Sequence, residues 1–287
     1  MLDPITEPFS HGIAQRALVE VLVLGAVCGP LGVWVVLYRQ SYAAESIAHG
    51  MLPGLVLAAL VGVPLGLGAA GGLIVAAAAI SLAGRERGVG SDAAVAVAIT
   101  ALFGAGALLA LAPEVPARLG ELLFGDPLGV TATDLLASAA LAVAVLAALY
   151  ALHRPLAAVA FDPQSAPSIG AGPGRTELAL LVLLALTTLV AVQALGNLLV
   201  VALIVAPAAA ALRFASRLPA ALGLSVALAI AGGVGGLYVS HYLKLAAGAS
   251  IALVALAIFV LSLPLGRSAR RPPESRPGPV EVATQGS

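Results

Sequence analysis

Residues 17–37 read ALVEVLVLGAVCGPLGVWVVL, and Glu20 is the only charged residue among them. A hydrocarbon core about 30 Å thick requires about 20 apolar residues in a helix, so this stretch is long enough to span a bilayer. It is longer than the apolar core of a signal peptide, and the residues before it carry Asp3 and Glu7 instead of a basic leader. We therefore expect a membrane span.

Eight further apolar runs follow, separated by charges, prolines and glycines. Of the 287 residues, 61% are hydrophobic and 10% are charged, against about 25% charged in ordinary soluble domains. This composition excludes a water-soluble globule and predicts an all-α, polytopic membrane helix bundle. The second run is short and contains Glu45, His49 and Pro53, so we expect 8 to 9 transmembrane helices. The expected spans cover residues 14–37, 44–61, 64–83, 92–111, 134–152, 176–194, 197–213, 218–240 and 249–265.

The positions of the cations predict how the bundle is oriented. Eleven arginines fall in alternate loops and in the tail, whereas the other loops hold only Arg16, Arg118 and Lys244. The positive-inside rule then predicts an extracytoplasmic N-terminus at 1–13 and a cytosolic C-terminus. The expected domains are a transmembrane domain at 14–266, a cytosolic loop within it at 153–175 and a disordered tail at 267–287. A net charge of zero gives no basic surface for nucleic acid.

Several polar or small residues have structural interpretations. Asp92, Asp134 and Glu177 stand at span starts and are expected to be helix N-terminal anions. Glu20 follows Arg16 by four residues, a spacing that predicts an ion pair. Glycines at four-residue spacing predict close helix packing, and these pairs are Gly25 and Gly29, Gly62 and Gly66, Gly68 and Gly72, and Gly232 and Gly236.

Glu45 and His49 in SYAAESIAHGMLPG (41–54) are the pair with a potential binding role. Four residues apart on a helix, they share one face with Cβ atoms about 6 Å apart. Pro53 lacks the N–H that would bond the His49 carbonyl, so a kink and a freed carbonyl are expected. A carboxylate with an imidazole suits Zn²⁺, Mn²⁺ or Fe²⁺. The same spacing is equally consistent with a structural Glu–His contact that locks two helices.

A second polar group stands at the end of the eighth span, where His241 lies between Ser240 and Lys244. His241 would complete a metal site with Glu45 and His49 if the two segments were neighbours. Alone, a histidine beside two tyrosines is an interfacial anchor.

The cytosolic loop at 153–175 is too long for a simple turn between helices. Its segment FDPQSA offers Asp162 as the N-cap of a short helix with Pro163 at the first position. Such a helix indicates docking to another protein. A P-loop needs Gly-Lys followed by Ser or Thr, and the only lysine, Lys244, lies between two leucines. This chain therefore has no ATPase motif of that kind, and any ATP hydrolysis must come from a partner.

Six segments, in this order and spacing, resemble the permease subunit of bacterial zinc and manganese ABC importers, the ABC-3 family. They are GPLGVWVVLYRQSYAAESIAHGMLPG (29–54), SDAAVAVAITALFGAG (91–106), LLFGDPLGVTATDL (122–135), FDPQSAPSIG (161–170), GNLLVVALIVAPAAAA (196–211) and AAGASIALV (246–254). The resemblance implies a homodimer in the lipid of the bacterial inner membrane, cytosolic ATPase subunits that use ATP, and an extracytoplasmic metal-binding lipoprotein. It implies a transport subunit, not an enzyme, with no permanently bound cofactor.

By the same resemblance, Glu45 and His49 coordinate the metal, and His241 lies in the family's second polar segment. The loop around Asp162, Ala166 and Gly170 corresponds to the region that docks on the ATPase. Three departures stand out: Glu45 replaces the commoner aspartate, Lys244 stands where a polar or acidic residue is expected, and LAAG (245–248) lacks the proline that many members carry before the glycine.

The working hypothesis is a permease subunit of an ABC importer for Zn²⁺ or Mn²⁺, with Fe²⁺ as a further cargo. Glu45 and His49 would bind the ion transiently. One alternative is a gradient-driven secondary metal transporter, which has no need of a docking helix in the cytosolic loop. Another is a non-transporting membrane scaffold, in which the pair is structural. A permease for siderophores or cobalamin would not call for an intramembrane carboxylate and imidazole.

Overall fold

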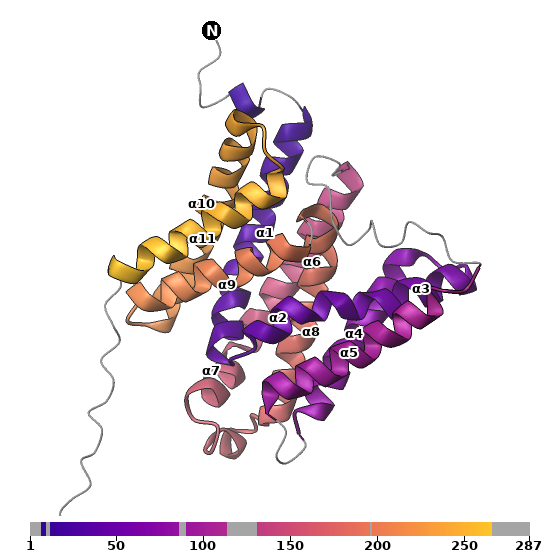
Figure 1. Ribbon diagram of the computed structural model, residues 1–287. Helices are drawn as coiled ribbons and strands as arrows, with labels where there is room; N and C mark the ends of the chain where they lie inside the picture. The colour runs from indigo at the N-terminus through magenta and orange to yellow at the C-terminus, as the bar shows by residue number, and fades with distance from the viewer. Residues whose placement is uncertain (1–6, 10–11, 86–89, 114–130, 196, 266–287) are drawn as a thin grey trace, which may run out of the picture.

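The computed structural model describes residues 7–9, 12–85, 90–113, 131–195 and 197–265, and all regular elements in these ranges are helices (Figure 1). The expected all-α fold is thus confirmed, while the tail at 267–287 lies outside the described residues. In chain order the elements, with η for 3₁₀ helices, are η1 (Glu7–Phe9), α1 (Gly12–Leu37), α2 (Ser41–Ser46), η2 (Ile47–Gly50), α3 (Met51–Val61), α4 (Leu65–Ala83), α5 (Ser91–Leu109), α6 (Ala132–Ala151), α7 (His153–Phe161), η4 (Ala166–Ile169), α8 (Pro173–Leu195), α9 (Asn197–Phe214), α10 (Leu218–Leu243) and α11 (Ala247–Leu265).

Eight helical segments in the described part of the chain are long and apolar enough to cross a membrane. The expected second span is one of them, at Ser41–Val61, although α2, η2 and α3 divide it into three pieces. The seventh expected span corresponds to α9, whose described apolar part is Val200–Phe214. The expectation of 8 to 9 spans is therefore met.

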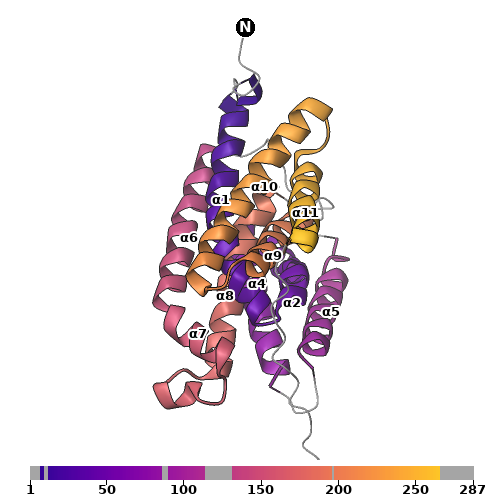
Figure 2. The ribbon, with the colours of Figure 1, turned by 90° about the vertical axis from the view of Figure 1, so that its left-hand side faces the viewer.

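Helices α1 and α8 run through the centre of the bundle (Figure 1). Helices α9, α10 and α11 pack on one side of this centre, and α3, α4 and α5 lie on the other, with α4 against α8 (Figure 1). Helix α6 lies beside α1 and also contacts α8 (Figure 2). Large, fully buried side chains come from α1, α8 and α9, among them Trp34, Leu31, Leu180, Leu184, Leu203 and Ile204. The segment α2–η2–α3 contacts α4 and α5, and its first two parts also contact α9 and α8, respectively.

Glycines decide where helices approach closely. A Cβ at Gly29 would lie 2.7 Å from a backbone nitrogen of α10, so only glycine permits this contact. Gly54 of α3 and Gly68 of α4 face each other so closely that a Cβ on either would collide with the carbonyl oxygen of the other. Gly62 and Gly66 have no neighbour within 4 Å, so this predicted pair marks no close packing. Gly62 instead ends α3 with φ +78°.

The loop at 153–175 is largely helical, but its helices begin elsewhere than expected. Helix α7 ends at Phe161, and Asp162 follows it with extended backbone angles instead of starting a helix at Pro163. The Asp162 carboxylate accepts a hydrogen bond from the Ser165 N–H at 3.1 Å, which closes a turn, so η4 starts only at Ala166. Asp162 thus makes the capping hydrogen bond that was expected, but the regular helix begins at Ala166 and not at Pro163.

Candidate functional site

The segment that carries the predicted metal ligands begins at a sharp corner after α1. Arg39 has φ +57°, and the Gln40 N–H donates to the Val35 carbonyl at 2.8 Å, which reverses the chain. Helix α2 therefore starts beside the end of α1 and leads back into the bundle (Figure 1).

Glu45 and His49 are both exposed, although the residues around them are buried. Those buried neighbours are Ala43, Ala44, Ser46, Ile47, Ala48 and Gly50. The change from α to 3₁₀ winding turns the chain by about 120° per residue instead of about 100°. The two side chains are therefore separated by roughly 80° around the axis, instead of roughly 40° in a continuous α-helix. The side chains of Glu45 and His49 nevertheless both lie on the exposed side of this segment. Among the described residues, none donates a hydrogen bond to Glu45.

Helix α5 borders this side of the segment. The His49 imidazole meets the Phe103 ring at 5.8 Å between centroids and 80° between planes, an edge-to-face contact. A Cβ at Gly106 would lie 2.8 Å from the Pro53 nitrogen, so α5 approaches the proline closely. The aromatic contact places the His49 imidazole beside α5. Phe103 and Gly106, which contact His49 and Pro53, lie three residues apart on one face of α5.

The irregular winding lies just before Pro53, over Ile47–Gly50. Met51 donates its N–H to the carbonyl oxygens of Ala48 and His49. The His49 carbonyl, expected to be free because Pro53 has no N–H, therefore has another donor.

His241 does not join Glu45 and His49 within one chain. It is exposed in the last turn of α10 and makes an edge-to-face contact with Tyr242 at 5.2 Å. Among the described residues there is no group of three or more His, Cys, Asp or Glu side chains that could hold a metal ion. The assignment of His241 as a ligand stays a prediction, and it requires a second chain or another conformation.

Other acidic side chains of the spans are held by the protein. Glu20 is 1% exposed and accepts a hydrogen bond from the Ser138 hydroxyl of α6 at 2.7 Å. The expected ion pair with Arg16 stays a prediction. The second carboxylate oxygen of Glu20 is buried without a hydrogen bond in the described structure. Asp134 forms a capping box with Thr131 at the start of α6, as its expected role at a helix N-terminus requires.

Glu177 near the start of α8 accepts a hydrogen bond from the Gln40 side chain at 2.7 Å. Gln40 and Glu177 are 137 residues apart, and Ser138 and Glu20 are 118 residues apart. No local pattern in the sequence pairs residues at such distances, so sequence analysis could not find Gln40 or Ser138 as partners.

Helix α7 contacts the end of α1 through a hydrogen bond and a ring contact. The Tyr38 hydroxyl donates to the Leu156 carbonyl at 3.0 Å, and burial raises the pKa of Tyr38 to about 12. The rings of Trp34 and His153 meet at 5.5 Å. These contacts join the corner before α2 to α7.

The turn beyond α7 presents apolar side chains outward. Phe161 is 65% exposed and Ile169 is 68% exposed. Between them, hydrogen bonds from the hydroxyl and the backbone N–H of Ser165 lower the pKa of Asp162, while Ala166 is buried. Gly170 has φ +79°, which favours glycine and ends η4. The three residues predicted to dock on a partner therefore form one compact turn with two exposed apolar residues.

Known proteins resemble this chain over most of its length. It is 32% identical over 88% of its length to the manganese transport system membrane protein MntC of Halalkalibacterium halodurans, covering 87% of that protein. It is 30% identical over 90% of its length to the chelated iron transport system membrane protein YfeD of Yersinia pestis, covering 87% of that protein. Among solved structures, PsaBC from Streptococcus pneumoniae in complex with Fab matches with a TM-score of 0.78 and 28% identity, covering 91% of this chain and 95% of that one. The model of the ABC 3 transport family matches residues 10–266, and the chain belongs to that family.

Proposed function

We propose that this chain is the membrane permease of an ABC importer for a divalent metal ion, with Mn²⁺ as the first candidate and Fe²⁺ as the second. The observation that carries the proposal is the exposure of Glu45 and His49 on one side of an otherwise buried segment. A carboxylate at membrane depth costs about 2.5–3.5 kcal/mol by insertion scales, so this side must face water or protein instead of lipid. A water-lined path or a second copy of the chain meets this requirement.

The donor types set the class of cargo. Carboxylate oxygen and imidazole nitrogen suit Mn²⁺, Fe²⁺ and Zn²⁺. Zn²⁺ was expected from these donors, but the two relatives described above are named for manganese and for iron. Two protein ligands from one chain leave further coordination positions to water or to a second copy, which keeps binding weak enough for release. His241 is a candidate for one of these further ligands.

The turn around Asp162, Ala166 and Gly170 is the proposed docking surface for a cytosolic ATPase. Phe161 and Ile169 supply exposed apolar area there, and the glycine at positive φ fixes the shape of the turn. The chain has no P-loop, so ATP binding and hydrolysis belong to that partner.

The proposed orientation puts α7 in the cytosol and the N-terminus outside the bacterial inner membrane. Support comes from the charges at the two ends of the bundle. The end with α7 carries Arg39, Arg85, Arg154 and Arg175, joined there by the Tyr38–Leu156 and Arg85–Gly174 hydrogen bonds. Arg16 and Lys244 lie at the other end, where Phe9 and Tyr238 are in ring contact. A metal-binding lipoprotein would deliver its ion at that outer end.

The test is uptake of Mn²⁺, Fe²⁺ and Zn²⁺, one ion at a time, in a bacterial strain that lacks its own importers and carries this chain with its ATPase. Glu45→Ala and His49→Ala are expected to lower uptake by at least about tenfold, since even loss of an outer-shell partner costs about 10–100-fold in metal affinity. Tyr42→Ala is the matched control, because Tyr42 is an exposed residue of the same α2 without a metal-binding group. It should transport normally.

Three outcomes would contradict the proposal. Full uptake by both alanine variants would remove the ligand assignment. Uptake that continues without the ATPase and collapses with the proton gradient would indicate a gradient-driven carrier. Normal assembly with the ATPase but no uptake of any of the three ions would indicate a scaffold.

A further inference from the structure

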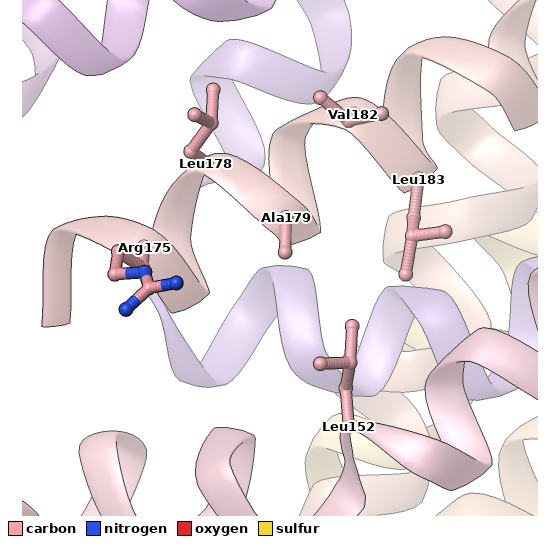
Figure 3. A pocket seen from close by; sticks show the side chains of 6 residues that line it. All are labelled: Leu152, Arg175, Leu178, Ala179, Val182 and Leu183. Atoms are coloured by element: carbon pink, nitrogen blue, oxygen red, sulfur yellow. The ribbon is translucent and has the colours of Figure 1, made fainter. Parts of the chain in front are cut away.

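A groove opens between α8 and the junction of α6 and α7, away from the Glu45 and His49 segment. It has a volume of about 410 Å³ and is lined by Leu152, Arg175, Leu178, Ala179, Val182 and Leu183 (Figure 3). Arg175, Ala179 and Leu183 stand four residues apart and point from one side of α8 toward Leu152 (Figure 3). The groove therefore runs lengthwise along the first turns of α8.

The lining has one charged end. Five of the six side chains are apolar, and the sixth is the guanidinium of Arg175, which is exposed at the beginning of the span Pro173–Val192. From Arg175 to Leu183 the groove extends about 12 Å along the helix axis, at about 1.5 Å per residue. That length is less than half of a hydrocarbon core of about 30 Å, so the groove stays within one leaflet.

No acidic side chain lines the groove. Glu177 is close in sequence, but it accepts a hydrogen bond from Gln40 and lies near Arg85, on the side of α8 that faces the corner after α1. Arg154, two residues beyond Leu152, is exposed on α7 and adds positive charge at the same end. The open end of the groove is therefore cationic.

We propose that the groove binds an anionic phospholipid, with the phosphate on Arg175 and one acyl chain along Leu178, Val182 and Leu183. Apolar contact alone does not distinguish a bound acyl chain from bulk lipid, since lipid tails are as apolar as leucine. Selectivity must then come from the pairing of guanidinium and phosphate, which is strong and directional. Basic pockets between transmembrane helices are suited to such headgroups. A second copy of the chain would fill the groove with apolar side chains and leave Arg175 without an anion.

The test measures lipid binding directly and does not depend on metal transport. The purified full-length chain is stripped of lipid in detergent and titrated with phosphatidylglycerol while bound lipid is counted by native mass spectrometry. One lipid per chain is expected to be retained, in preference to phosphatidylcholine with the same acyl chains. Arg175→Gln is expected to weaken binding about fivefold, since one arginine near an anionic lipid surface contributes roughly 1 kcal/mol. Ala179→Trp fills the groove and should abolish retention.

Two matched variants control for general effects. Arg217→Gln removes an exposed arginine at the start of α10, and Ala140→Trp adds an indole to the exposed face of α6. Both should retain the lipid as the unaltered chain does. Equal retention of the two lipids, equal loss in Arg175→Gln and Arg217→Gln, or full retention in Ala179→Trp would each overturn the proposal. Displacement of the lipid by glycerol phosphate, which has the phosphate but no acyl chain, would also overturn it.

Discussion

Glu20 and Glu45 are carboxylates of neighbouring helices, α1 and α2, and the fold surrounds them differently. Glu20 is enclosed between α1 and α6 and accepts the Ser138 hydroxyl. Glu45 is exposed beside His49, and none of the described residues donates a hydrogen bond to it. A buried acid that accepts a hydrogen bond from a neighbouring helix, even through one oxygen only, contributes to packing, whereas an exposed acid beside an imidazole is available to a cargo. Burial of a charge in a membrane protein is therefore not by itself the sign of a transport site.

The largest expected effect is on Mn²⁺ uptake, when the charge of Glu45 or of Glu20 is removed without a change in side-chain size. Glu45→Gln keeps the size of the side chain but removes the anionic ligand, so Mn²⁺ uptake should fall by at least about tenfold. Glu20→Gln keeps an oxygen for the Ser138 hydroxyl and should change uptake by less than about twofold. Both are measured as uptake per amount of protein in the membrane. Equal losses in the two variants would mean that Glu20 also serves the cargo.

The second effect concerns stability at Glu20. Ser138→Ala removes the hydrogen-bond donor to Glu20 and leaves the buried carboxylate without it, which should cost about 1–3 kcal/mol in the free energy of unfolding. Ser81→Ala is the control, because the hydroxyl of Ser81 is buried in α4 with no hydrogen-bond partner among the described residues. Removing it should be neutral or stabilising. Thermal unfolding in detergent measures both variants, and a larger loss for Ser81→Ala would contradict the assignment.

The smallest expected effect is on the melting temperature, at the contact between Tyr38 and α7, and it depends on pH. The pKa of Tyr38 is raised from 10.0 to about 12 in the folded protein, mainly because burial disfavours the tyrosinate. Its contribution to stability is therefore fully present below about pH 10 and is lost as the pH rises from about 10 toward 12. Tyr38→Phe should lower the melting temperature slightly near pH 8 and flatten its decline above pH 10. An alkaline decline of the same steepness in both proteins would show that other groups cause it.

The sequence by itself determined the class of fold and nearly every span. Apolar runs of about 20 residues have only one low-energy solution in a bilayer, the helix that satisfies its own backbone hydrogen bonds. For the same reason the expected spans at 64–83 and 249–265 agree with α4 and α11 within a residue or two. The sequence also predicted that Glu45 and His49 lie on one side of their segment, because helical spacing is a local property of the chain, and both side chains are exposed there. Their role as metal ligands stays a prediction.

Tertiary structure alone decided which polar groups are satisfied and which are open. Ser138 and Gln40 reach their carboxylates across more than a hundred residues of sequence. The groove beside Arg175 is lined by residues of α8 and by Leu152, which lies between α6 and α7. The 3₁₀ turn changes the direction in which the His49 side chain points. This turn lies where Gly50 packs closely against α4 and Pro53 packs closely against α5. Contacts of this kind depend on distances between segments, which hydrophobic periodicity does not encode.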